Sequence, residues 1–234
     1  MYVNPGQFSP SEDLSTYPFD FHGDILKLKS VPGGVDAVFA PKNLYNYREN
    51  KKIEERGLGH ETWVRVERLE KGLWGKSRPV FFRGVATIVS NLFHIVGPDV
   101  AVFGKKDYQQ WRIIQRMVRD LDFIVGFDIV LDDDGLALSS RDVHLSPEER
   151  EKALSISRSL LKAKSDAKRG LGNCKELTDT DVQTITEAGG RIDYAEIVEQ
   201  ESLEAVEGIK NPVVFCIAAW FGKVRLIDNI EISI

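Results

Sequence analysis

The middle of the chain alternates helix-like and strand-like segments. Apolar residues recur at helical spacing over residues 85–96, and a short apolar run at 99–103 has the length of a buried strand. Residues 107–121 follow the helical period again, and 123–130 read as a second strand. Because strands joined through a helix pair in parallel within one sheet, this alternation predicts an α/β architecture with a parallel sheet.

The N-terminal segment shows weaker signals of the same kind. Residues 2–3 read as the end of a strand that stops at the turn-forming residues 4–6. Residues 20–29 carry one apolar face at helical spacing, and residues 35–39 read as a strand. Residues 46–61 are polar and charged, which predicts a surface loop.

The second half has a different pattern. Ser146 starts a capping box with proline at the first helical position, and this helix is expected to run to about Lys164. A Lys- and Gly-rich loop is expected over residues 165–175, followed by a helix that ends at Gly189. Three strands follow, the last two as a hairpin, over residues 191–198, 213–220 and 223–228.

Helices followed by antiparallel strands predict a small α+β domain behind the parallel sheet. We place the boundary near residue 129, which gives an N-terminal domain of residues 1–129 and a C-terminal domain of residues 130–234.

Composition excludes several classes of protein. With 42% hydrophobic and 29% charged residues, the 234-residue chain is typical of globular proteins. The net charge of −5 comes without a basic stripe, so no nucleic-acid partner is expected. No apolar run approaches the roughly 20 residues that span a bilayer, and no signal sequence precedes the first strand, so we expect a cytosolic protein without a membrane partner.

The cysteines and histidines suggest no metal site. Cys174 and Cys216 lie far apart, and Cys216 is embedded in an apolar run, which favours a buried, reduced thiol. The four histidines do not stand at ligand spacing from one another or from the cysteines.

The most informative cluster follows the first predicted strand of the parallel sheet. Gly104, Lys105, Lys106 and Asp107 join that strand to a helix, and Gln110 lies one turn into the helix. Ligands of open α/β sheets bind beyond the carboxyl ends of the strands, where a helix N-terminus attracts anions. Lys106 offers a charge for phosphate, while the alternative interpretation is a capped helix with solvated lysines.

Weaker candidates surround this cluster. Leu138, Ser139, Ser140 and Arg141 form a Gly-led segment that suits a polyphosphate or an ordinary turn. Arg78 could clamp a carboxylate or simply sit in solvent. Gln7 offers an amide at a strand-end turn, and Val130 ends the second predicted strand.

The acidic run at residues 132–134 suits Mg²⁺ or a solvated loop.

Together these clusters resemble pantothenate synthetase, the pantoate–β-alanine ligase family, and its plant members most closely. The matching motifs occur in order along the whole chain: residues 2–8, 77–79, 84–87, 103–110, 116–121, 134–141 and 225–229. The resemblance implies a Rossmann-like nucleotide-binding domain followed by a small C-terminal domain that closes over ATP. It also implies a homodimer.

The resemblance further implies a two-step reaction with MgATP. The carboxylate of pantoate attacks the α-phosphate to give pantoyl adenylate and pyrophosphate, and the amine of β-alanine then displaces AMP. Gln7 and Gln110 are expected to hold pantoate, with Gln7 also near β-alanine. The residues expected to bind ATP or act on its phosphates are Gly104, Lys105, Lys106, Asp107, Val130, Leu138, Ser139, Ser140 and Arg141.

Some family features have no counterpart in these residues. The resemblance begins inside the second strand of the family fold, so the first βα unit and its His-x-Gly-His turn are missing from it. Leu131 and Asp142 stand where the family usually has Arg and Asn. A different nucleotidyltransferase is disfavoured because Gln7 and Gln110 both stand in their motifs.

The missing unit contains the central strand of such a sheet, so we expect a poorly folded N-terminal half when the chain is alone. An unpaired buried backbone group costs about 1–3 kcal/mol. The alternative to an active ligase is therefore an inactive truncated remnant that binds only nucleotide or an intact partner subunit.

Overall fold

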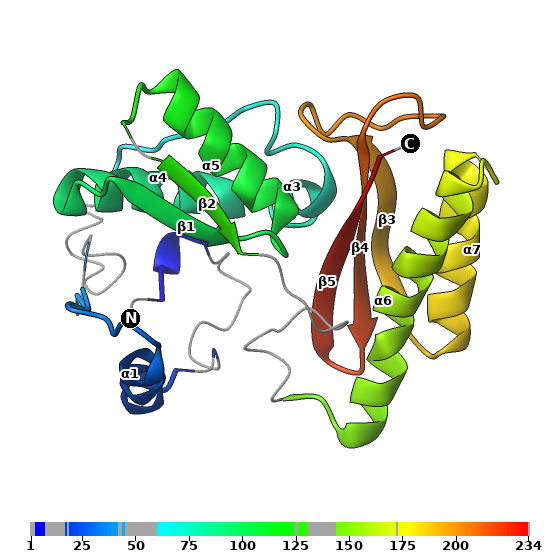
Figure 1. The fold of residues 1–234 in the computed structure, drawn as a ribbon, viewed down its shortest axis with the longest axis horizontal. Helices are drawn as coiled ribbons and strands as arrows, with labels where there is room; N and C mark the ends of the chain where they lie inside the picture. The colour runs from blue at the N-terminus through cyan, green and yellow to red at the C-terminus, as the bar shows by residue number, and fades with distance from the viewer. Residues whose placement is uncertain are drawn as a thin grey trace.

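The computed structural model describes residues 3–7, 17, 19–41, 44, 60–124, 126–130, 144–171 and 173–233. Figure 1 shows an N-terminal half with a short parallel sheet and a C-terminal half with an antiparallel sheet flanked by two helices. The N-terminal half contains the 3-10 helix Pro5–Gln7 and then α1 (Phe21–Ser30), α3 (Leu73–Ser77), α4 (Phe81–Val96), β1 (Val100–Gly104), α5 (Tyr108–Asp120) and β2 (Gly126–Val130). The C-terminal half contains α6 (Pro147–Lys168), α7 (Cys174–Glu187), β3 (Arg191–Glu199), β4 (Val213–Phe221) and β5 (Val224–Ile232).

The strand–helix–strand unit predicted in the middle of the chain is confirmed. β1 and β2 pair in parallel, from Val100 opposite Gly126 to Gly104 opposite Val130. α4 and α5 pack together through a buried apolar cluster that includes Val85, Ile114 and further residues of both helices. α4 ends at Gly97, whose φ of 59° lies in the left-handed region that favours glycine. The N-terminal half is therefore of the α/β class with a parallel sheet, and a small α+β domain follows it.

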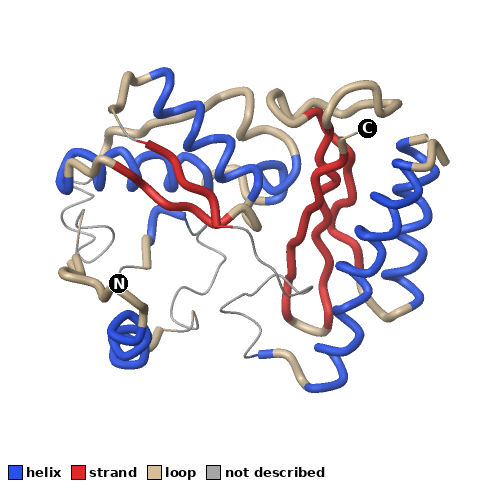
Figure 2. Tube along the Cα trace, in the orientation of Figure 1, coloured by secondary structure: helices blue, strands red, loops and turns tan. Residues whose placement is uncertain are grey.

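The antiparallel sheet has the order β3-β4-β5, and α6 and α7 cover one of its faces (Figure 2). Both helices begin with a capping box, formed by Ser146 with Glu149 in α6 and by Asn173 with Glu176 in α7. α7 ends before Gly189, whose φ is 92°. The strands, the hairpin and the helix starts predicted for this half are confirmed.

β4 shows why its sequence is apolar throughout. Phe215, Ile217 and Ala219 face the core beneath α6 and α7. The alternating residues Cys216 and Ala218 face the opposite side, in a second cluster shared with the N-terminal half. Because successive side chains of a strand point to opposite faces, a strand buried on both faces needs a continuous apolar run. The buried thiol predicted for Cys216 is confirmed.

That second cluster joins the two halves of the molecule. Its members from the N-terminal half include Leu73, Trp74 and Tyr108, and those from the C-terminal sheet include Val214 and Ile227. The C-terminal sheet is thus packed between two layers, α6 and α7 on one side and α3 and α5 on the other (Figure 1). The division at residue 129 stays a prediction, and it falls at the end of β2.

α1 forms where expected, although Phe21 on its apolar face is 42% exposed. Two other predicted element positions are wrong. Residues 35–39 form no strand, because none of the described residues pairs with them, and Val35 and Phe39 are 44% and 48% exposed. The loop expected over 165–175 is shorter, because α6 continues past the buried Ala163 to bury Ala167 as well.

Two further expectations fall wholly or largely outside the described residues. The surface loop expected over residues 46–61 is one, and the candidates at 131–143 are the other. Among the described helices, none combines the length and apolar character needed to cross a membrane.

Candidate active site

The turn between β1 and α5 lies where the sequence placed a phosphate site. β1 ends at Gly104, and α5 begins at Tyr108 with Asp107 at its N-cap position. The Asp107 side chain makes no capping hydrogen bond, because its backbone (φ −87°, ψ 63°) is not in the extended conformation typical of an N-cap. Asp107 therefore occupies the N-cap position of α5 without capping it through its side chain.

Asn229 of β5 holds this turn from the C-terminal half. Its side-chain Nδ2 donates to the backbone carbonyl oxygens of Lys105, at 3.1 Å, and of Lys106, at 2.8 Å. One amide thus satisfies two carbonyls of the turn that would otherwise lack these partners. Asn229 stands in the motif of residues 225–229, whose sequence pattern alone does not predict this contact.

The two lysines of the turn differ in what they contact. Lys105 Nζ lies 2.5 Å from Glu231 Oε2 and 5.2 Å from the centre of the Trp111 ring, and its side chain is 16% exposed. Lys106 is half-buried and has no partner for its ammonium group among the described residues. Lys105 is therefore engaged within the protein, while the Lys106 ammonium group makes no such contact with the described residues.

Two adjacent glutamines also take separate roles. Gln109 is buried, and its amide donates to Leu69 O at 2.7 Å and Gly72 O at 2.8 Å. Its Oε1 accepts from Gly75 N at 3.4 Å, so it holds the segment that leads into α3. Gln110 is half-buried, lines a cavity with Lys106 and has no hydrogen-bond partner among the described residues.

Gln7 is positioned by the 3-10 helix and the start of α4. Asn4 Nδ2 donates to Gly84 O at 3.1 Å, and Asn4 Oδ1 accepts from Gly6 N at 3.1 Å. A Cβ at Gly84 would lie 2.3 Å from Gly6 O, so this close approach requires glycine. Arg78 Nη2 donates to Gln7 O at 3.0 Å.

Phe81 connects the two groups of candidate residues. Its ring lies 4.5 Å from the Arg78 guanidinium carbon, and it also lines the cavity that contains Lys106 and Gln110. The structure therefore brings Lys106, Asp107 and Gln110 together in one cavity, while Gln7 is held by Arg78, whose guanidinium group contacts the Phe81 ring.

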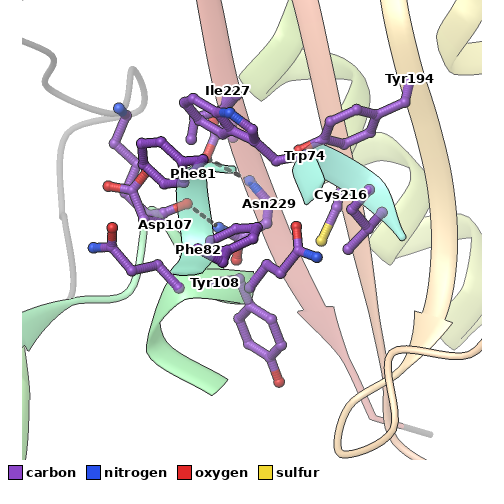
Figure 3. Close-up of a pocket in the computed structure, with 14 residues that line it drawn as sticks. Trp74, Phe81, Phe82, Asp107, Tyr108, Tyr194, Cys216, Ile227 and Asn229 are labelled. Atoms are coloured by element: carbon purple, nitrogen blue, oxygen red, sulfur yellow. Dashed lines mark hydrogen bonds between the residues drawn. The ribbon is translucent and has the colours of Figure 1, made fainter. Parts of the chain in front are cut away.

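Figure 3 shows the cavity, which lies between α3, α4, α5 and the C-terminal sheet. Its volume of about 20 Å³ is close to the space for one water. Its lining is largely apolar or aromatic on the side of the sheet: Tyr194, Cys216, Ile227, Asp228 and Asn229. The cavity is a narrow seam beside the turn and is too small to hold whole substrates.

The two phenol groups and the thiol that line this seam stay protonated near neutral pH. Burial raises the pKa of the Tyr108 phenol and of the Tyr194 phenol above their ordinary value. Burial also raises the pKa of the Cys216 thiol, and the nearby carboxylates of Glu196 and Asp228 raise it further. A nucleophilic thiolate or phenolate is therefore not available here.

The remaining predicted residues are only partly described. The backbone of Val130 pairs with Gly104 at the end of the two strands, next to the turn. Leu138, Ser139, Ser140 and Arg141 lie outside the described residues, as do residues 132–134, Leu131 and Asp142. Within the described ranges, no group of three or more His, Cys, Asp or Glu side chains forms a metal site.

Comparison with known proteins places this geometry in a family. The family model described as pantoate–β-alanine ligase matches residues 1–231. The pantoate–β-alanine ligases of Lotus japonicus and Arabidopsis thaliana are each 65% identical to the chain over its full length, which covers 82% and 81% of those proteins.

Solved structures agree with this match. The crystal structure of pantothenate synthetase from Thermus thermophilus has a TM-score of 0.85 at 40% identity, covering 98% of this chain and 81% of that one. The pantoate–β-alanine ligase from Francisella tularensis, solved with a β,γ-ATP compound and β-alanine, has a TM-score of 0.72 at 29% identity, with 98% and 77% coverage. The chain belongs to the pantoate–β-alanine ligase family.

Proposed function

We propose that this protein condenses (R)-pantoate with β-alanine in an ATP-dependent reaction of pantothenate biosynthesis, releasing AMP and pyrophosphate. The observation that carries the proposal is the β1–α5 turn, in which Asn229 fixes the backbone of Lys105 and Lys106 while the Lys106 charge and the Gln110 amide stay available. This arrangement suits an anion at a helix N-terminus with a hydrogen-bonding group one turn further along.

In the first step, a carboxylate oxygen of pantoate attacks the α-phosphorus of ATP. The new P–O bond forms pantoyl adenylate, and the bond to the bridging oxygen breaks to release pyrophosphate. Gln110 and Gln7 orient the pantoate, and the Lys106 ammonium balances negative charge on the phosphates. We assign Ser139, Ser140 and Arg141 to further phosphate contacts on the strength of the family motif.

In the second step, the amine of β-alanine attacks the acyl carbon of the adenylate. A C–N bond forms, AMP leaves with the former carboxylate oxygen of pantoate, and the amine loses its proton. No covalent enzyme intermediate is required, which agrees with the protonated state of Cys216 and of the two buried tyrosines. The work of the protein is positioning and charge balance.

Three finer assignments belong to the same proposal. Mg²⁺ would enter bound to ATP, where it would neutralise phosphate charge. The protein is proposed to be a homodimer and cytosolic, following the family resemblance. Light scattering of the purified chain tests the dimer by its mass.

One observation favours a second candidate function. Val100 and Val102 of β1 are 56% and 58% exposed, and β1 pairs only with β2 among the described strands. Exposed apolar strand residues of this kind invite a covering segment. The second candidate is therefore a subunit that binds nucleotide and completes its sheet against an intact partner.

The test is AMP release by the purified chain with ATP, Mg²⁺, pantoate and β-alanine. The ligase function predicts turnover that depends on β-alanine and is lost in Lys106→Ala and Gln110→Ala. Lys168→Ala and Gln183→Ala are matched controls, since both side chains are exposed on helices of the other half. Absence of turnover in a chain shown to be folded supports the second candidate.

A further inference from the structure

A larger cleft lies beside the candidate active site, between α3 and the turn that joins β4 to β5. It has a volume of about 320 Å³ and is lined by Trp74, Ser77, Arg78, Asp193, Trp220, Lys223 and Arg225. Small-molecule sites range from roughly 300 to 1,000 Å³. The cleft is thus large enough for a small ligand, whereas the seam beside Lys106 is not.

The charges of the cleft are mostly held in place. Arg225 donates from Nη2 and Nε to Asp193 Oδ2, at 2.6 and 3.0 Å, and its guanidinium carbon lies 4.3 Å from the Trp74 ring centre. Arg78 is held by Gln7 O and by the Phe81 ring. Together with Lys223, the lining carries three positive charges and the single negative charge of Asp193.

Two hydrogen-bond donors of the lining lack acceptors. The indole Nε1 of Trp74 and the Nη1 of Arg225 are both buried and have no hydrogen-bond partner among the described residues. The one acidic acceptor of the lining is already used, because Asp193 Oδ2 accepts from Arg225 and also from Ser77 Oγ, at 3.1 Å. A lining rich in donors and short of free acceptors calls for a ligand that supplies acceptors.

Lys223 is the cation of the cleft whose side chain can change its conformation. It is exposed in the turn after Gly222, and no partner for its ammonium group is present in the described part of the chain. Trp220 provides a flat wall beside it and is itself contacted by Arg191, 5.2 Å from the ring centre. A long, unpaired lysine next to fixed guanidinium groups can close onto an anion after it enters.

We propose that this cleft is a binding site for a small oxyanion, a molecule that presents a phosphate or a carboxylate group. Arg225 and Lys223 supply the charge and donate hydrogen bonds, and Trp220 supplies a flat apolar wall. The site is separate from the turn that carries Lys106, and its occupancy does not depend on the proposed ligase activity.

The test is a titration of the full chain followed by tryptophan fluorescence, since Trp74 and Trp220 both line the cleft. Inorganic phosphate, inorganic pyrophosphate and pantoate are titrated separately, which distinguishes phosphate from carboxylate as the source of the anion. We expect a saturable change with at least one of them, and Trp220→Phe should reduce its amplitude. Absence of a saturable change with all three overturns the proposal.

Variants then locate the binding. Lys223→Glu should weaken it by about tenfold or more, as expected for reversing a charge that contacts an anion. Lys210→Glu changes an equally exposed lysine outside the cleft and should leave affinity unchanged. Lys106→Ala should leave the part of the signal that depends on Trp220 unchanged, because Lys106 does not line the cleft. Loss of binding in Lys106→Ala together with full binding in Lys223→Glu places the anion at the β1–α5 turn and contradicts the proposal, whatever the outcome of the AMP assay.

Discussion

The side-chain amide of Asn229 donates a 2.8 Å hydrogen bond to the backbone carbonyl of Lys106, across 123 residues of sequence. The same amide nitrogen also reaches the carbonyl of Lys105 at 3.1 Å. The last strand of the C-terminal sheet therefore sets the shape of the turn that presents the candidate phosphate-binding lysine.

Replacing Asn229 should weaken ATP binding. Asn229→Ala removes both hydrogen bonds and leaves two carbonyls of the turn unpaired, a loss of about 1–3 kcal/mol, so we expect the dissociation constant for ATP to rise about tenfold or more. Calorimetric titration with ATP measures this. Gln183→Ala, which removes an exposed amide from α7, is the control, and equal ATP affinity in the wild type and Asn229→Ala would contradict the role given to Asn229.

The adjacent glutamines of α5 should respond differently to the same substitution. Gln109→Ala leaves Leu69 O and Gly72 O without their donor and should lower the free energy of unfolding by about 1–3 kcal/mol. Gln110→Ala should change it by less than about 0.5 kcal/mol and should instead abolish turnover. Urea unfolding and AMP release, measured on both variants, separate the two roles; equal destabilisation would argue against them.

The contact between Gly84 and Gly6 should not tolerate a side chain. A Cβ at position 84 would lie 2.3 Å from Gly6 O, so Gly84→Ala should push the 3-10 helix that carries Gln7 away from α4. We expect a loss of about 1–3 kcal/mol in stability, typical of overpacking, with weaker pantoate binding. Gly208→Ala is the control, because nothing lies within 4 Å of a Cβ there. Wild-type pantoate affinity in Gly84→Ala would show that Gln7 does not depend on this contact.

Asp181 should make stability depend on pH. Burial between α6 and α7 raises the pKa of Asp181 to about 7 from an ordinary value of 3.8, although Ser159 lowers it somewhat. Between these values the folded state holds a proton that the unfolded state has lost, so stability falls as pH rises through this window, by at most about 1.4 kcal/mol per pH unit.

Asp181→Asn removes this dependence. The variant should match the wild type near pH 4 and be more stable than it at pH 8, whereas Asp179→Asn, on the exposed side of α7, should track the wild type at both. Urea unfolding at the two pH values measures the difference. If the free energies of unfolding of Asp181→Asn and the wild type differ by the same amount at both pH values, the raised pKa of Asp181 is contradicted.

The sequence predicted those parts of the fold that local pattern determines. The sequence of β4 is one apolar run because both faces of the strand are buried. The turn at Gly104 was predictable because the strand pattern ends there and a helical pattern begins directly after it. The capping box that starts α6 at Ser146 is equally local. The capping box that starts α7 at Asn173 was not predicted, because it lies in the loop expected over residues 165–175.

What the pattern could not predict depends on partners distant in the chain. Residues 35–39 have the composition of a strand, but a strand forms only where another strand pairs with it. Gln109 and Gln110 are neighbours that point about 100° apart on a helix, and sequence alone does not say which faces the core. The Asn229 contact and the donors of the Trp74–Arg225 cleft likewise arise from packing between the two halves.

The central claim is that a carboxylate oxygen of pantoate is activated by transfer of AMP from ATP. The most direct measurement uses pantoate labelled with ¹⁸O in its carboxylate, incubated with the chain, MgATP and β-alanine, with AMP and pantothenate analysed by mass spectrometry. The account predicts one ¹⁸O in each AMP and one in the amide product. AMP without label, or no AMP from a folded chain, would contradict it.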